Sequence, residues 1–465
     1  MQVARQIPVI NFDIQSNNLK IKGVDVHIYK LAKLVIGVNN IVVENVTFNE
    51  KAQQIIIDAR PTKWHELECG KCGCKAKHYD GKGKRRTWRC LDIASTKCFV
   101  RSQALRVKCP HCGVVARQVP WAAHDSYFTY TFEQTCAWHA LNMSKLACTK
   151  LMRIQWRTVG DICARVEARL SNTRPALLDN LKRIGVDETS YKKGHKYMTV
   201  VINHDTGAVV WCAKGYGEKV FAQFFEQLTP KARREIELVS ADGARWVDST
   251  LRKYCPGAKR CIDTFHVVSW ATDVLDEVRK QAWRQAHEKV KSVAKTPVGR
   301  PKANKVVNKE KKCANKVKGY RYPLLKNPEN LTKTQAIKLE MLVKSNPKLY
   351  RAYLLKEELR LALKQPVENI ESALKKWRGH AWRSKIPEFV KLQRKIKRHM
   401  QAIIQTAKSG ITNAQVEAVN NSIKLIVKTA FGFRNFDNLK SMVMLKLSGL
   451  NIKLPGRQKT ASQMS

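Results

Sequence analysis

Three short apolar runs, each leading to an aspartate, constrain the fold of this chain more than any other feature. They cover residues 182–187, 236–241 and 258–262, and their aspartates are Asp187, Asp242 and Asp263. Two β-branched segments, 197–203 and 208–213, flank the turn sequence 204–207, which predicts a hairpin. Apolar spacing predicts a helix over 218–228, and residues 245–254 can form another. The expected order is therefore strand, strand, strand, helix, strand, helix, strand.

That order is typical of a ribonuclease-H-like core, so we expect an α/β fold with a mixed five-stranded sheet. Asp187 and Asp242 would then end neighbouring strands on one side of the sheet, where paired carboxylates can share divalent ions. Mg²⁺ prefers oxygen ligands and keeps several waters, so a few carboxylates suffice. Two such ions can activate an attacking oxygen and stabilise a leaving one in phosphoryl transfer. Either aspartate alone would more often be a turn residue, but the pair favours a metal site.

The charge of the chain predicts a polyanionic partner. Among 465 residues, Lys and Arg number 86 and Asp and Glu 38, a formal net charge of +48. Nucleic acid is the expected partner because each neutralised phosphate releases counterions, and a membrane surface is the weaker alternative. No apolar run approaches the roughly 18 residues of a spanning helix, and the N-terminus lacks a signal-peptide pattern. The 14 cysteines in so long and basic a chain suggest reduced thiols and a metal site.

Two Cys-x-x-Cys pairs predict a structural Zn²⁺ site. The four cysteines are Cys69, Cys72, Cys109 and Cys112. Each pair places two thiolates on one tight turn, and two pairs complete a tetrahedral shell. The segment between them is longer than in a compact zinc ribbon, so a hairpin or loop must fill it. It also holds Cys74, Cys90 and Cys98, which leaves the choice of ligands open. Unconnected thiols and a redox pair are the alternatives, although no thioredoxin-like context surrounds either pair.

Residues 127–170 predict three helices, over 132–142, 144–151 and 156–170. Their lengths and the short segment 152–155 are typical of a helix-turn-helix, whose second helix enters the major groove of DNA. An ordinary packed helix pair is the alternative.

The segment after the third aspartate predicts a helical insertion over 268–408. A helix over 267–293 leads into residues 289–326, a flexible segment rich in Lys and Arg that can be a solvated linker, a phosphate-tracking arm, or both. Helices with mixed apolar and charged faces return over 331–405.

The helix that begins at Asn413 carries a candidate third carboxylate. Val416 and residues at helical spacing after it form an apolar face that would pack on the sheet. Glu417 lies beside that stripe and can reach over the sheet edge to the strand-end aspartates. A solvated helix face is the alternative.

Several motifs together resemble the transposases of the ISL3 group of bacterial insertion sequences. They are Gly185-Val-Asp187-Glu188, Lys193-Gly-His195, Ser240-Ala-Asp242-Gly243, Asp263-Thr-Phe-His266 and Asn413-Ala-Gln-Val-Glu417-Ala-Val-Asn420. The paired cysteines and the helix-turn-helix, both ahead of the core, extend the resemblance over nearly the whole chain. It implies a DDE catalytic domain interrupted by a helical insertion, with Asp187, Asp242 and Glu417 as the catalytic triad that holds Mg²⁺ or Mn²⁺. Asp263 and His266 match a further motif whose role stays open, so they are possible accessory residues.

We therefore expect a DNA transposase that binds the terminal inverted repeats of its element and cuts and joins DNA. Its partners would be double-stranded DNA, at element ends and target, and further copies of itself in a homodimer or larger synaptic complex. The protein would be cytoplasmic, beside the bacterial nucleoid. A ribonuclease-H-like junction resolvase or nuclease is one alternative, and a non-enzymatic transposase-derived DNA-binding protein is another.

The expected domains follow the chain in order. They are a β-containing lead-in (1–62), a zinc ribbon (63–120), a helix-turn-helix (127–172), the first part of the catalytic core (181–267), the helical insertion (268–408), the second part of the core (409–450) and a loose tail (451–465).

Overall fold

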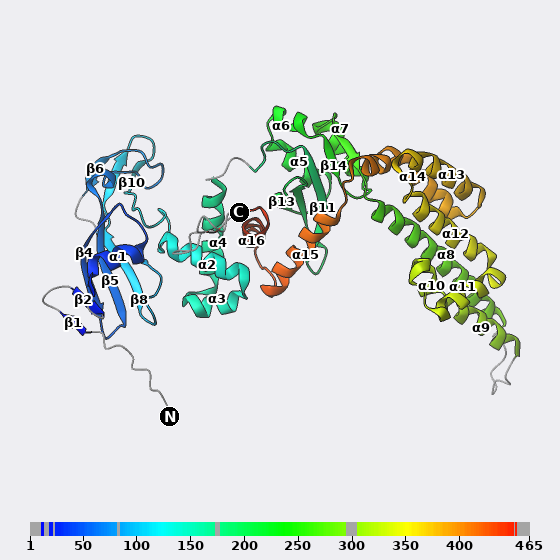
Figure 1. Ribbon diagram of the computed structural model, residues 1–465, viewed down its shortest axis with the longest axis horizontal. Coiled ribbons are helices and arrows are strands. Elements are labelled where there is room, and N and C mark those ends of the chain that lie inside the picture. The colour runs from blue at the N-terminus through cyan, green and yellow to red at the C-terminus, as the bar shows by residue number, and fades with distance from the viewer. Residues whose placement is uncertain are drawn as a thin grey trace, which may run out of the picture. The chain divides into compact units, whose positions relative to one another are not determined.

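The computed structural model of the protein describes residues 11–13, 18–21, 24–80, 84–172, 177–293, 305–450 and 452 (Figure 1). The chain divides into two compact units, one of residues 1–175 with 426–465 and the other of residues 176–425. The tail expected from residue 451 lies outside the described residues except for Ile452. In the described part of the chain, no helix is both long and apolar enough to cross a membrane.

The first unit opens with a β-rich module. A small antiparallel sheet of β1 (Asn11–Asp13), β2 (Asn18–Ile21) and β3 (Val24–His27) precedes α1 (Ile28–Ile36). A second sheet has the order β4-β5-β8-β7, from β4 (Ile41–Asn49), β5 (Gln54–Pro61), β7 (Arg85–Arg89) and β8 (Lys97–Gln103). Ile36, Ile57, Trp88, Val100 and Trp121 pack together in its core.

The strands β7 and β8 correct the predicted boundary at residue 62. They lie between the two cysteine pairs, yet β8 pairs with β5 in parallel and β7 pairs with β8. The hairpin that fills the long segment between the pairs therefore belongs to the sheet of the lead-in. The remaining strands there, β6 (Lys77–Asp80), β9 (Arg106–Cys109) and β10 (Gly113–Ala116), form a separate antiparallel sheet, after the short helix η1 (Lys63–His65).

The three helices expected over 127–170 are present as α2 (Tyr130–Asn142), α3 (Lys145–Met152) and α4 (Trp156–Asn172). Thr129 and Ser144 cap α2 and α3, because their hydroxyl oxygens accept hydrogen bonds from the third residue of each helix. Arg153, with a φ of +52°, ends α3 in the left-handed region and so turns the chain into α4.

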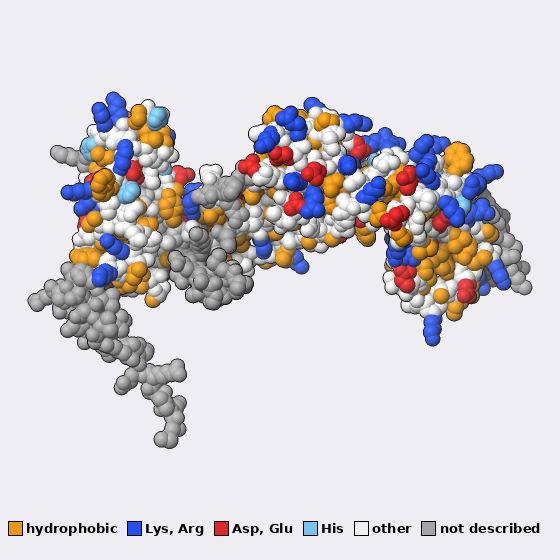
Figure 2. All heavy atoms as spheres, turned by 45° about the horizontal axis from the view of Figure 1, so that its top comes forward, with side chains coloured by type: hydrophobic (Ala, Val, Ile, Leu, Met, Phe, Trp, Pro, Cys, Tyr) orange, Lys and Arg blue, Asp and Glu red, His pale blue; other side chains and the backbone are white. Residues whose placement is uncertain are grey.

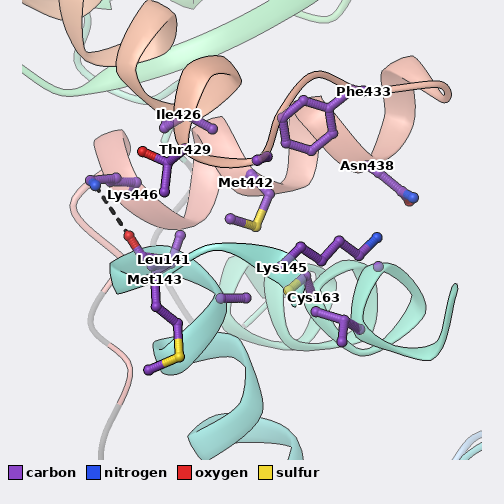
Figure 3. A pocket seen from close by; sticks show the side chains of 14 residues that line it. Leu141, Met143, Lys145, Cys163, Ile426, Thr429, Phe433, Asn438, Met442 and Lys446 are labelled. Carbon is purple, nitrogen blue, oxygen red and sulfur yellow. Dashed lines mark hydrogen bonds between the residues drawn. The ribbon is translucent and has the colours of Figure 1, made fainter. Parts of the chain in front are cut away.

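A fourth helix from the far end of the chain, α16 (Phe436–Leu447), packs on α4 and α2. Figure 3 shows Met442 and Ile426 facing the helices that carry Leu141 and Cys163, and Lys446 Nζ donating to the carbonyl oxygen of Leu141 at 3.2 Å. The prediction that residues 409–450 belong wholly to the catalytic core therefore needs correction. The unit boundary falls after Leu425, and α16 completes the helical module of the first unit.

The second unit holds the mixed five-stranded sheet that the sequence predicts. Its order is β13-β12-β11-β14-β15, formed by β11 (Arg183–Lys192), β12 (Lys196–Asn203), β13 (Val209–Lys214), β14 (Leu238–Ser240) and β15 (Lys259–Cys261). The first three strands are antiparallel neighbours, whereas β11, β14 and β15 run parallel. The strand β11 does not end at Asp187 as expected but continues to Lys192, paired with β12 alone.

Helices cover both faces of this sheet (Figure 1). Helices α5 (Glu218–Glu226) and α7 (Arg245–Tyr254) bury Phe221, Phe225 and Val247 against Ile184 and Val186 of β11. Between them lies an unexpected short helix, α6 (Pro230–Glu235), which Thr229 caps and Pro230 begins. Because side chains alternate along a strand, Gly185 and Asp187 face the opposite side. Val416 of α15 (Ala414–Thr429) packs there against Gly185.

The predicted insertion is a helical bundle. Its elements are α8 (Thr264–Val293), α9 (Lys305–Gly319), α10 (Arg321–Leu325), η2 (Pro328–Asn330), α11 (Lys333–Ser345), α12 (Pro347–Ala362), α13 (Val367–Arg383) and α14 (Pro387–Ser409). Leu275, Leu349, Trp377 and Phe389 are among its fully buried side chains. The last helix, α14, returns to the sheet, where Thr406 Oγ1 donates to the carbonyl oxygen of Ile262.

The expectation of a flexible basic segment over 289–326 is wrong for most of that range. Helix α8 continues to Val293, and α9 and α10 occupy 305–325. Helix α9 packs on α8, and Ala314, Val317 and Tyr320 are buried. The apolar contacts with α8 thus hold a lysine-rich sequence in a helix.

Candidate functional site

Three aspartates share one row at the edge of the five-stranded sheet. Gly185 pairs with Ser240 on β14, and Ser240 pairs with Cys261 on β15. Asp187, Asp242 and Asp263 each follow these paired residues by two positions. Because β14 ends at Ser240, the edge of β11 beyond Gly185 is open on that side. The register of the parallel strands therefore brings the expected strand-end carboxylates to one place.

The carboxyl group of Asp187 lies in a buried and negatively charged environment. Burial raises its pKa and the charge of Asp242 raises it further, whereas the backbone N–H of Glu188 and the charge of His266 lower it. Burial also raises the pKa of the neighbouring Glu188, as do Asp242 and Asp187. Within the described residues, no ion pair joins Asp187 or Asp242 to a Lys or Arg side chain. Clustered carboxylates of this kind can be stabilised by a divalent cation.

Helix α15 is fixed against the aspartate row at two points. Asn420 Nδ2 donates to Asp187 Oδ2 at 2.7 Å, and the backbone N–H of Asn413 donates to Asp263 Oδ2 at 2.5 Å. A Cβ on residue 185 would lie 2.7 Å from Val416 Cγ2, so only glycine allows the helix to approach this closely. Glu417 lies between the two fixed points on the same helical face.

Glu417 itself is exposed, and no hydrogen bond or ion pair in the described part of the chain joins it to Asp187 or Asp242. The structure thus brings the two expected aspartates together, and Glu417 lies on the helix that bonds Asp187, without direct contact to either aspartate. Its role as the third carboxylate stays a prediction.

Asp263 is used for local structure. Its Oδ1 accepts from the N–H of Phe265 at 2.7 Å at the start of α8, while Oδ2 holds Asn413. Its side chain is 9% exposed. Asp263 therefore joins the point where the chain enters the insertion to the point where it returns. His266, one turn into α8, is close enough to Asp187 to influence that carboxyl, and its Nε2 is buried without a hydrogen-bond partner among the described residues.

Sequence reasoning missed several residues around the site. No role was predicted for Asn420 from the sequence, although its position three residues after Glu417 puts it on the same helical face. Trp270 of α8 packs directly on Gly243, which leaves no room for a Cβ there. Lys395 Nζ of α14 lies 3.5 Å from the centre of the Trp270 ring. Burial lowers the pKa of Lys395 and the charge of Asp242 raises it, so the insertion supplies a cation beside the aspartate row.

The paired cysteines form a second candidate site, in the first unit. The four sulfur atoms of Cys69, Cys72, Cys109 and Cys112 all lie within 4.8 Å of one another. Although burial raises the pKa of Cys69, hydrogen bonds from the backbone of Cys72 and Lys71 outweigh it and lower that pKa to about 7. Cys90 and Cys98 are buried in the core of the other sheet, and Cys74 is exposed outside the group. The fold thus favours the four expected cysteines.

On the face that Figure 2 draws, basic side chains are not gathered in one patch. Figure 2 shows Lys and Arg over many parts of the face that it draws, with acidic side chains among them.

Comparison with known families defines the class of this protein. A model of the DDE transposases of the ISL3 group matches residues 184–443, and a model described as the helix-turn-helix domain of transposase family ISL3 matches residues 117–167. The chain belongs to the ISL3 family of transposases, as an insertion-sequence transposase with helix-turn-helix and DDE domains.

Two relatives extend the likeness over most of the chain. The transposase of insertion sequence element IS1557 from two strains of Mycobacterium tuberculosis is 41% identical over 433 residues, which cover 92% of this chain and 97% of the relative. The transposase of element IS1001 from Bordetella parapertussis is 26% identical over 371 residues, covering 79% of this chain and 85% of that one.

Proposed function

We propose that this transposase binds the terminal inverted repeats of its element, cuts the DNA there, and joins the freed ends to target DNA at the aspartate row. The sheet of β11 to β15 would be a ribonuclease-H-like core. The observation that carries the proposal is the shared register, which sets Asp187 beside Asp242 at the open edge of β11.

The residues present fit a site for divalent metal ions. Asp187, Asp242 and Glu417 would hold Mg²⁺ or Mn²⁺, because the first two are clustered carboxylates without a basic ion-pair partner in the described chain. When bound, such ions supply activation of an attacking oxygen and stabilisation of a leaving oxygen in phosphoryl transfer. Glu417 is on the helical face between the residues that bond Asp187 and Asp263, which supports its assignment as the third carboxylate.

The neighbouring residues position this site. Asn420 would fix the orientation of the Asp187 carboxylate through its hydrogen bond to Oδ2. Lys395, held over the Trp270 ring, would contact a DNA phosphate beside Asp242. The chemistry then needs no serine or tyrosine nucleophile, since water and a DNA 3′-hydroxyl are the attacking groups.

The first unit would select the DNA site. Helix α4, the second helix of the helix-turn-helix, would place side chains in the major groove of the inverted repeat, and α16 would support it by packing on α4 and α2. Cys69, Cys72, Cys109 and Cys112 would hold a structural Zn²⁺ in a ribbon formed by β6, β9 and β10. Because transposition pairs two element ends, a homodimer or larger synaptic complex would carry it out.

One assay tests the whole proposal. The purified protein is mixed with labelled element-end DNA and Mg²⁺ and scored for cleavage and for joining to a second DNA. Asp187→Asn, Asp242→Asn and Glu417→Gln should each abolish both reactions while DNA binding persists, because each removes a charge that the metal ions need. Glu235→Gln on α6 is the matched control and should react normally.

Each outcome of this assay decides between functions. Metal-dependent cutting by all three variants would disprove the DDE assignment. Cutting of branched junctions without a preference for element ends would indicate a resolvase. Specific binding by the wild-type protein with no cutting would indicate a transposase-derived DNA-binding protein.

A further inference from the structure

A cavity of about 500 Å³ in the first unit lies between the first cysteine turn, the β4-β5-β8-β7 sheet and helix α4. Several of its lining residues carry buried nitrogen atoms that lack a hydrogen-bond partner. Among the described residues that line the cavity, these atoms are Arg86 Nε, Trp88 Nε1, Arg117 Nε and Nη1, His124 Nδ1 and Arg169 Nη2. Among the described lining residues, no side-chain oxygen atom is buried without a hydrogen-bond partner. The lining residues therefore carry more unpaired donors than acceptors, apart from His124 Nδ1, whose role depends on its tautomer, and this favours a ligand that accepts hydrogen bonds.

The walls of this cavity are held together by hydrogen bonds across its modules. The N–H groups of Thr129 and Tyr130, where α2 begins, donate to the carbonyl oxygens of Arg89 and Trp121 at 2.9 and 2.8 Å. Arg165 of α4 donates to Glu133 of α2 at 2.7 Å. The helices therefore have a fixed position on the β module, and the cavity is a preformed feature of the unit.

The charge of the walls favours an anion. Lys71, Arg86, Arg117, Arg165 and Arg169 line the cavity, and Asp125 is its one acidic residue. Glu133 already pairs with Arg165 and Arg169. Arg117 is only 6% exposed, its Nη1 is 3.6 Å from Glu66, and burial lowers its pKa. A buried guanidinium with open donors is unfavourable unless an acceptor completes its hydrogen bonds.

We propose that this cavity holds a phosphate group of the DNA backbone. Phosphate oxygens accept several hydrogen bonds and suit the planar fork of an arginine. Residues from the cysteine turn and from α4 would then bind the same phosphate. This contact would fix the position of the helix-turn-helix along the DNA of the inverted repeat. This inference rests on the proposed binding of element ends.

The test uses the full-length protein and element-end DNA in which one phosphate at a time is replaced by a neutral methylphosphonate. In the wild-type protein, one position should weaken binding by about 10- to 100-fold, the loss expected for charge-assisted hydrogen bonds. In Arg117→Gln the same replacement should change affinity less than about twofold, since its partner is already gone. The dependence of affinity on salt should also fall by about one released ion.

Two further variants keep the test decisive. Lys71→Gln removes an exposed lining charge and should show the same loss of coupling if Arg117→Gln fails to fold. Lys51→Gln removes an equal charge from the turn between β4 and β5, outside the lining, and should behave as wild type.

A melting experiment tests whether the cavity binds a free small anion instead of a DNA phosphate. The melting temperature is measured in inorganic phosphate and in chloride at equal ionic strength. Phosphate stabilisation that Arg117→Gln abolishes, without any coupling to a DNA phosphate, would overturn the proposal in favour of a small-anion site. No coupling and no stabilisation would also overturn it. If the wild-type protein does not prefer element ends at all, the proposed function fails instead.

Discussion

Asp263 should contribute to the stability of the catalytic unit and should not act as a metal ligand. Its two oxygens accept from the N–H groups of Phe265 and Asn413 at 2.7 and 2.5 Å. In Asp263→Ala, loss of the first bond resembles loss of a helix N-cap, about 1 kcal/mol. Loss of the second leaves a buried N–H without a partner, about 1–3 kcal/mol. The free energy of unfolding should therefore fall by about 2–4 kcal/mol.

For a unit of this size, each kcal/mol lowers the melting temperature by about 2–4 °C, so Asp263→Ala should melt about 4–16 °C lower. Asp263→Asn keeps one acceptor oxygen and should lose about half as much. Differential scanning fluorimetry measures the change, and hydrogen exchange should locate it at the starts of α8 and α15.

The matched variant is Asp242→Asn, which lies in the same row. Among the described residues, its side chain accepts only from the N–H of Ala244, in an exposed turn, so Asp242→Asn should melt close to wild type and lose DNA cleavage. Asp263→Asn, assayed well below its melting temperature, should still cut. If Asp263→Asn melts like wild type but cannot cut, while Asp242→Asn cuts normally, Asp263 is the metal ligand and the structural reasoning is refuted.

Three further predictions concern other parts of the chain. Cys109→Ser should release Zn²⁺ and unfold the cysteine module, because structural zinc supplies folding free energy, and full metal content by a colorimetric chelator assay would contradict it. Burial lowers the pKa of His204, whose ring bonds Ser240 and Gln415, so the stability that this neutral ring provides is present above about pH 6.5 and lost as the pH falls. The melting temperature of His204→Gln should therefore change less between pH 7 and 5 than that of the wild type. The same pH dependence in both proteins would contradict this reasoning. Gly160→Ala should weaken the packing of α16 on α4 and lower the melting temperature, since its Cβ would lie 2.6 Å from Asn438 Nδ2. An unchanged melting temperature would mean that Asn438 moves aside and would contradict the prediction.

The succession of strands and helices that builds the five-stranded sheet could be predicted because it depends on local sequence. Runs of β-branched residues form strands, and turn residues at 204–207 join two of them into a hairpin. The aspartates could be named because each follows such a run. Their alignment in one row followed from the parallel pairing that the strand order implied. The cysteine pairs were equally visible, since each is a local turn.

Other features depend on contacts between distant residues, which no local pattern shows. The return of α16 to α4, the joining of β7 and β8 to the lead-in sheet, and the approach of Lys395 to Asp242 all belong to this class. The lysine-rich α9 is helical because α8 covers its apolar side.

The sequence by itself determined the family and the succession of strands and helices along the chain, and it named the candidate metal-binding residues, because these are properties of short segments and their spacing. Only the tertiary structure decided that Asp263 bonds two backbone N–H groups, that Asn420 orients Asp187, and that arginines from separate modules surround one cavity. The physical reason is that hydrogen bonds and burial arise between surfaces, and the chain brings those surfaces together only when it folds.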